Sequence, residues 1–160
     1  MTGTGTATMQ DILGPKAVLA RLESNTKKQA LQDLAGHAAA ALDLEAHGVF
    51  DVLWAREKLG TTGVGHGIAI PHGRIAGLTQ VRGFFARLAE PVAFEAVDDR
   101  AVDLVFLLLA PETAGADHLH ALAMVSRLLR DPKLCEDLRC AKDATSIESL
   151  LSVAATAKAA

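Results

Sequence analysis

The chain has 160 residues with 16 Lys and Arg against 19 Asp and Glu, which gives a formal net charge of −3. Half of its residues are apolar and 22% are charged, a balance that indicates one globular domain and excludes a disordered chain. The mild acidity provides no electrostatic footprint for nucleic acid or anionic lipid. No apolar run reaches the roughly 18 residues that cross a bilayer, and residues 1–7 lack the features of a signal peptide. We therefore expect a cytoplasmic protein with no nucleic-acid partner and no membrane insertion.

Hydrophobic periodicity predicts both strands and helices along the chain. The predicted elements are a short apolar turn over 9–13, a strand over 17–22, helices over 27–44 and 45–59, strands over 81–88 and 102–109, and helices over 117–129, 132–140 and 146–153. The oxygens of Ser24 to Thr26 can start the first helix, Gly60 ends the second, and Asp117 can cap the third. The strand over 102–109 has almost no polar break, which indicates a central strand covered on both faces. We see no internal repeat and no linker, so we expect an α/β protein with one small mixed sheet and helices on both of its faces.

The two cysteines do not indicate a metal or disulfide site. Cys135 and Cys140 lie five residues apart, and they form neither a CxxC pair nor a four-ligand zinc set. We therefore expect plain buried or surface thiols.

The most informative segment runs from Gly63 to Gly73. Its three glycines at alternate positions allow backbone N–H groups to turn toward an anion, but it lacks the Gly-Lys-Ser/Thr ending of a nucleotide-binding loop. Pro71 fixes the backbone before His72, whose imidazole is a good nucleophile near neutral pH. Two alternatives remain open on spacing alone: a strand-end histidine bonded to a carbonyl, or a metal-binding pair with His66.

Residues 56–73 read Arg-Glu-Lys-Leu-Gly-Thr-Thr-Gly-Val-Gly-His-Gly-Ile-Ala-Ile-Pro-His-Gly. This run resembles the signature of the enzyme IIA proteins of the fructose/mannitol type in the phosphotransferase system, and most of all their nitrogen-related branch (IIA-Ntr, PtsN-type). The resemblance extends from about Met9 to Val153 and includes Glu-Pro-Val-Ala-Phe-Glu over 90–95 and His-Leu-His-Ala-Leu over 118–122. Such a long ordered match is far more specific than one motif.

The resemblance implies a three-layer α/β/α sandwich over residues 9–155, between a flexible N-terminus (1–8) and a flexible tail (156–160). It implies that His72 is the phosphorylated histidine, that Arg56 lies against the phosphoryl group, and that His118 is a second active-site histidine. The implied donor is a phosphohistidine on an HPr-like (NPr-type) carrier protein, which an enzyme I-type phosphotransferase charges from phosphoenolpyruvate. No cofactor or metal is implied.

Physical arguments support these roles and add weaker candidates. An arginine fork suits phosphoryl oxygens, although Arg56 on residue type alone reads as a solvated helix-end cation. His118 belongs to a first helical turn, where free N–H groups attract anions. Further phosphate-binding candidates are the Thr62 hydroxyl and the backbones of Gly65 and Gly67.

Two more expectations concern the surroundings of the site. His120 follows His118 by two residues, so the two imidazoles cannot face one pocket squarely, and we expect His120 at the rim or surface. For the carrier protein we expect an apolar docking rim around His72, built from Ile68, Ile70 and Ile75.

Three functions are compatible with these features. The first is a regulatory phosphocarrier whose two phosphorylation states bind different target proteins. The alternative is a sugar-uptake IIA that passes phosphate to the cysteine of a IIB domain. The third is a binding module without phosphorylation, which the presence of Arg56, His72 and His118 together disfavours.

Overall fold

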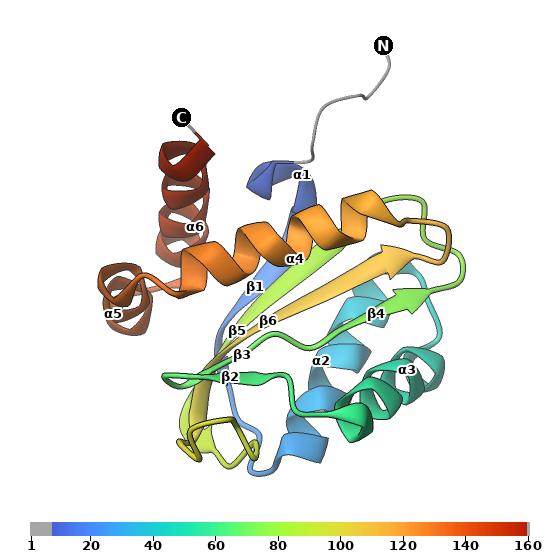
Figure 1. The fold of residues 1–160 in the computed structure, drawn as a ribbon, viewed down its shortest axis with the longest axis horizontal. Helices are drawn as coiled ribbons and strands as arrows, with labels where there is room; N and C mark the ends of the chain where they lie inside the picture. The colour runs from blue at the N-terminus through green and yellow to red at the C-terminus, as the bar shows by residue number, and fades with distance from the viewer. Residues whose placement is uncertain (1–7, 160) are drawn as a thin grey trace.

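The structure, a computed structural model, describes residues 8–159 (Figure 1). Its elements, in chain order, are α1 (Met9–Ile12), β1 (Leu13–Leu22), α2 (Lys27–Leu42), α3 (Ala46–Leu59), β2 (Gly63–Gly65), β3 (Ile68–Ala69), β4 (His72–Ile75), β5 (Arg82–Val92), β6 (Val102–Pro111), α4 (Ala116–Leu129), α5 (Pro132–Cys140) and α6 (Ala144–Ala159). Within this part of the chain, no helix is long and apolar enough to cross a membrane.

The strands form one mixed sheet in the order β1-β5-β6-β3-β2, and β4 also pairs with β6. β6 is antiparallel to β5 and parallel to β3 and β4. Nearly every side chain of β6 is buried, because the strand has neighbours on both edges and helices over both faces. The prediction of a central strand over 102–109 is therefore confirmed.

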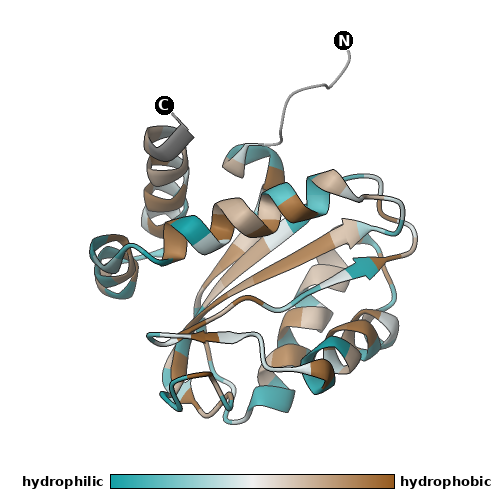
Figure 2. Ribbon diagram, viewed as in Figure 1, coloured by the Kyte–Doolittle hydropathy of each residue, from teal (hydrophilic) through white to brown (hydrophobic). Residues whose placement is uncertain are grey.

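Helices cover both faces of the sheet. α4 crosses in front of the strands in Figure 1, and α2 lies behind them, with α3 beside β4. α5 and α6 pack at one end of α4, and α6 also reaches β1. Figure 2 shows hydrophobic residues along the middle strands and alternating hydrophobic and hydrophilic patches along α4, as expected for a helix with one buried face. The predicted three-layer α/β/α sandwich is confirmed.

Several boundaries differ from the sequence prediction. β1 begins at Leu13, four residues early, because a bulge at Lys16 (φ 60°) interrupts the alternation that marks a strand. α4 begins at Ala116 after Gly115, so Asp117 lies inside the first turn and is not the cap. α6 continues to Ala159, so residues 156–159 are helical where we expected a tail. Of the N-terminal segment expected to be flexible, residues 1–7 lie outside the described residues, and Thr8 caps α1.

Candidate active site

His72 is the first residue of β4 and pairs with Leu108 of β6. Its Nδ1 lies 2.9 Å from the carbonyl oxygen of Ile70. A carbonyl only accepts hydrogen bonds, so Nδ1 carries the proton, and Nε2 holds the lone pair in the neutral ring. The carbonyl-bonded histidine that we considered as an alternative is thus present, and the same contact makes Nε2 the nucleophilic atom.

Arg56 lies in the last turn of α3 and reaches His72 directly. Its Nε is 3.3 Å from Nε2 of His72, and its Nη1 donates to the carbonyl oxygen of Gly60 at 2.8 Å. That carbonyl belongs to the residue that ends α3. The guanidinium is therefore held between the helix end and the imidazole, which excludes the interpretation of Arg56 as a freely solvated cation.

His118 approaches His72 from the opposite layer, in the first turn of α4. The two ring centroids are 5.6 Å apart with an interplanar angle of 62°. His118 is only 7% exposed, and its Nδ1 has no hydrogen-bond partner among the described residues. The cap residue Gly115 also provides no side-chain hydrogen bond to the first turn. This end of α4 thus presents donors that the rest of the site leaves unused.

The surroundings favour neutral imidazoles. Burial lowers the pKa of His72, and the nearby Arg56 charge lowers it further, against the hydrogen bond to Ile70 and the Glu57 charge, which raise it. Burial also lowers the pKa of His118, with smaller contributions in the same direction from His72 and Arg74. Both pKa values lie below the usual 6.5, so His72 keeps its lone pair at neutral pH.

Gly73 sets the distance between β4 and α3. A Cβ atom placed on Gly73 would lie 2.5 Å from Cγ1 of Val52, closer than real carbon atoms approach. Side chains alternate between the two faces of a strand, so the side chain of His72, the residue before Gly73, points away from Val52. The glycine therefore lets α3 bring Arg56 up to the imidazole.

Three predicted phosphate-binding candidates do not join this cluster. The Thr62 hydroxyl is buried and donates to the Glu57 carboxylate at 2.5 Å. Gly67 accepts from the backbone of Asp103 and Leu104 on β6, about 13 Å along that strand from the partner of His72. Gly65 lies beside the carboxylate of Asp98, which repels an anion.

Gly65 and Gly67 instead form the turn between β2 and β3. Their φ angles are 104° and 80°, values that residues with a side chain rarely adopt. The alternate glycines that we interpreted as an anion loop thus serve this turn, and the interpretation is corrected.

The remaining candidates also lie apart from the three central residues. His66 occupies the β2–β3 turn and is exposed, so it does not pair with His72, and residues 8–159 contain no cluster of three or more potential metal ligands. His120 is exposed on α4, as we expected. Ile68, Ile70 and Ile75 are buried in the core and cannot form a docking rim. That expectation was wrong, because Ile68 of β3, Ile70 after it and Ile75 of β4 all belong to the hydrophobic core.

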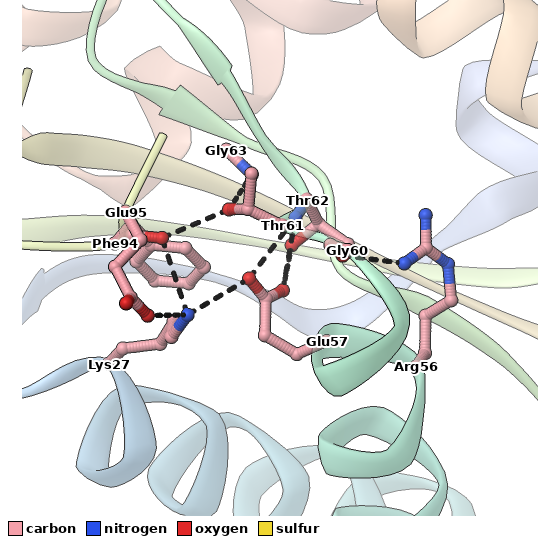
Figure 3. A network of polar contacts seen from close by, with 9 residues as sticks. All are labelled: Lys27, Arg56, Glu57, Gly60, Thr61, Thr62, Gly63, Phe94 and Glu95. Carbon is pink, nitrogen blue, oxygen red and sulfur yellow. Dashed lines mark hydrogen bonds and ion pairs between the residues drawn. The ribbon is translucent and has the colours of Figure 1, made fainter. Parts of the chain in front are cut away.

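Sequence reasoning missed a polar network beside the site. Figure 3 shows Lys27 from α2, Glu57 from α3 and Glu95 from the segment after β5, linked by hydrogen bonds and ion pairs. One signal for it was available: Glu57 continues the buried stripe of Val49 and Leu53 at four-residue spacing. A carboxylate in a buried stripe requires partners.

The central cluster has a clear chemical capacity. A neutral Nε2 nucleophile, a guanidinium fork and unused donors at a helix end converge from β4, α3 and α4. A tetrahedral group with several anionic oxygens would find positive charge and donors on two sides. The arrangement suits acceptance of a phosphoryl group on nitrogen.

Comparisons with known proteins agree with this geometry. The family described as "Phosphoenolpyruvate-dependent sugar phosphotransferase system, EIIA 2" matches residues 11–153. The nitrogen regulatory protein of Bradyrhizobium diazoefficiens is 54% identical over 143 residues, which cover 89% of this chain and 94% of that protein. The fructose-specific EIIA component of Haloferax volcanii is 37% identical over 130 residues, 79% of this chain and 83% of that one.

A solved structure supports the same assignment. The crystal structure of nitrogen regulatory protein IIA-Ntr from Neisseria meningitidis is similar with a TM-score of 0.83 at 37% identity, covering 88% of this chain and 97% of that chain. The chain therefore belongs to the EIIA 2 family of the phosphoenolpyruvate-dependent sugar phosphotransferase system, and within that family it is similar to the nitrogen regulatory proteins.

Proposed function

We propose that this protein is a phosphocarrier of the nitrogen-related phosphotransferase relay. His72 accepts a phosphoryl group from a phosphohistidine on an HPr-like (NPr-type) carrier, which an enzyme I-type phosphotransferase charges from phosphoenolpyruvate. The phosphorylation state then regulates target proteins, and the relay operates in the cytoplasm. The observation that carries the proposal is the orientation of His72, with Nδ1 bonded to Ile70 and Nε2 directed at Arg56.

The transfer needs no proton movement at His72. The lone pair of Nε2 attacks phosphorus, the P–N bond of the donor breaks, and the donor ring keeps the bonding electron pair. The proton on Nδ1 stays in its hydrogen bond to Ile70 throughout. Because both bonds are P–N bonds of imidazole, the step is nearly balanced in energy, and catalysis consists of positioning and charge neutralisation.

Arg56 first donates a hydrogen bond to the nucleophilic nitrogen of His72 and then binds an oxygen of the phosphoryl group. Its Nε–H occupies the Nε2 lone pair in the resting state, so it must move to a phosphoryl oxygen as the new bond forms. The bond from Nη1 to Gly60 keeps the guanidinium nearby during this exchange. His118 and the uncapped first turn of α4 contribute donors from the other side.

Two exposed leucines replace the isoleucines as the docking rim for the carrier. Leu119 follows His118 on α4 and is 66% exposed, and Leu59 lies one turn after Arg56 on α3 and is 85% exposed. The two leucines belong to α3 and α4, the helices that also carry Arg56 and His118, so a carrier that reaches His72 would meet an apolar side chain on each helix.

A sugar-uptake role is the second candidate. It is favoured by the similarity to the fructose-specific EIIA component of Haloferax volcanii, which is close to that shared with the Neisseria regulatory protein. Both roles use the same nucleophile and differ only in the acceptor. Transfer of labelled phosphate to the cysteine of a purified IIB domain would support uptake, and its retention on this protein would support regulation.

Mass spectrometry of the protein tests the phosphocarrier proposal. The protein is incubated with phosphoenolpyruvate, an enzyme I-type phosphotransferase and the HPr-like carrier, and the wild type is compared with His72→Gln. We expect one acid-labile phosphate on the wild type and none on the variant. His120→Gln is the matched control, since it changes an exposed histidine of α4 two residues after His118 and should remain labelled.

Two results would contradict the proposal. An unphosphorylated wild type in the presence of a charged carrier would favour the binding-module function. Labelling that persists in His72→Gln would move the nucleophile to another residue, and His118 would be examined next.

A further inference from the structure

The carboxylate of Glu57 is almost completely buried, with only 2% of its side chain exposed. It accepts hydrogen bonds from the backbone N–H of Thr62 at 3.1 Å and from the Thr62 hydroxyl at 2.5 Å. The ammonium group of Lys27 lies 3.2 Å from its other oxygen. Figure 3 shows these contacts from α2, α3 and the segment that follows α3.

Helix stability does not explain this arrangement. Lys27 is the first residue of α2, where the helix dipole disfavours a cation. Burial opposes protonation of Lys27, but its hydrogen bonds to Glu95 and Glu57 outweigh burial and raise its pKa. A buried ion pair is in general no more stabilising than apolar residues in its place. The network therefore suggests a role in geometry.

Hydrogen bonds connect Glu57 to Nδ1 of His72 through Thr62 and Ile70, and the backbone connects it to Nε2 through Arg56. The carbonyl of Thr62 accepts from the N–H of Ile70 at 3.0 Å, and the carbonyl of Ile70 is bonded to Nδ1 of His72. Nε2 of His72 accepts from Arg56, the residue directly before Glu57. These contacts form a loop that runs from Glu57 through Thr62 and Ile70 to His72 and returns to Glu57 through Arg56. A shift of Thr62 relative to Glu57 would be transmitted to the distance between Arg56 and His72.

We propose that Glu57 is a positioning residue for phosphoryl transfer, which holds Thr62 against the end of α3 so that Arg56 and Nε2 of His72 stay in register. Lys27 is its counter-ion. This inference rests on the proposed function, because it assigns Glu57 a part in the transfer to His72. It also assigns the Thr62 hydroxyl to Glu57 and not to phosphate.

The charge of Glu57 provides a second readout. The positive charge of Arg56 disfavours protonation of His72, and the negative charge of Glu57 favours it. The other titratable groups nearby are His118 on α4 and Arg74 on β4. Removal of the Glu57 charge should therefore lower the pKa of His72 further. A residue with only a structural role far from the imidazole would leave that pKa unchanged.

The first experiment compares Glu57→Gln with the wild type. Steady-state phosphorylation by the charged carrier should show kcat reduced by about tenfold to a hundredfold, because small misplacement of reacting groups costs that much, with KM for the carrier changed less than twofold. Asp103→Asn is the matched control: it also removes a carboxylate bonded to a cation, Arg139, but at the other end of β6, and it should transfer at the wild-type rate.

A second pair of variants keeps the inference testable if Glu57→Gln fails to fold. Thr62→Ser retains the hydroxyl donor to Glu57 and should transfer within about twofold of the wild type, whereas Thr62→Val removes the donor at similar volume and should lower kcat about tenfold. Equal rates for the serine and valine variants would overturn the inference.

NMR titration of the His72 ring separates this inference from the phosphocarrier proposal. If the wild type is never phosphorylated, the proposed function fails, but a lower His72 pKa in Glu57→Gln would still show that the Glu57 carboxylate acts on the imidazole. Wild-type kcat together with an unchanged His72 pKa in Glu57→Gln would overturn the positioning role.

Discussion

The two nitrogens of His72 have different partners, and this division leaves Nε2 as the atom that would accept the proposed phosphoryl group. The Ile70 carbonyl is bonded to Nδ1, and Arg56 donates to Nε2. Neither partner requires a charged imidazole, and burial lowers the pKa of the ring. At the residue scale the site is therefore prepared with a neutral nucleophile whose lone pair is aligned by a cation.

A lysine at position 56 tests whether the arginine fork matters beyond its charge. Arg56→Lys keeps one positive charge but cannot bond Gly60 and His72 simultaneously as the guanidinium does. We expect transfer to slow by about tenfold to a hundredfold, which corresponds to about 1.4–2.8 kcal/mol. Single-turnover phosphorylation measures this effect.

Arg82→Lys is the control for that variant, because Arg82 also donates to a backbone carbonyl, that of Asp11, but beside α1. It should transfer at the wild-type rate. If Arg56→Lys did so too, the charge alone would be sufficient, and the fork would have no role.

At the scale of elements, the site depends on how closely β4 approaches α3. Gly73 and Val52 touch where the two elements cross, and Arg56 follows Val52 by one helical turn. On the side of the His72 imidazole away from α3, the site is bounded by the N-terminal end of α4, which carries His118. The imidazole thus lies between two helices that belong to different layers of the sandwich.

The packing of β4 against α3 predicts the effect of a single methyl group. Gly73→Ala should reduce the free energy of unfolding by about 1–3 kcal/mol, since the new Cβ overlaps Val52 and α3 must move outward. Urea unfolding measures the loss. The double variant Val52→Ala, Gly73→Ala should recover part of it, because the overlapping atoms are removed. A single variant as stable as the wild type would show that the contact is not tight.

At the scale of the whole molecule, the half-buried His72 and the buried His118 couple the site to overall stability. His72 and His118 both have lowered pKa values, with burial as the largest cause. In the unfolded chain each titrates near its usual value of about 6.5. Between that value and the folded-state pKa, the unfolded chain therefore binds more protons than the folded one.

This coupling predicts a stability that falls on the acidic side of neutrality. The free energy of unfolding should be constant with respect to these two groups above about pH 7 and should decrease as the pH falls below about 6.5. Urea unfolding from pH 8 to pH 5 measures the slope. His118→Gln should flatten it, whereas His120→Gln, at an exposed position, should not. An equal slope in wild type and His118→Gln would contradict the role of burial.

Local sequence patterns were sufficient for much of the fold. The unbroken apolar run of β6 predicted a central strand, and Thr26 and Gly60 marked the helix ends that the structure has. Patterns failed where tertiary contacts override them. The bulge at Lys16 hid the start of β1. α6 continued past the predicted end, where the half-buried Ala154 and Ala155 pack against the core.

The family and the candidate residues follow from the amino-acid sequence alone, because an ordered run of residue types around Arg56, His72 and His118 is specific without any geometry. The folded chain was needed to show that these three side chains meet and that Gly65 and Gly67 lie elsewhere. The contact between the Glu57 carboxylate and the Thr62 hydroxyl is likewise visible only in the folded chain. The physical reason is that periodicity encodes the burial of a residue within its own element, whereas distances between elements depend on strand register and on helix packing across the sheet.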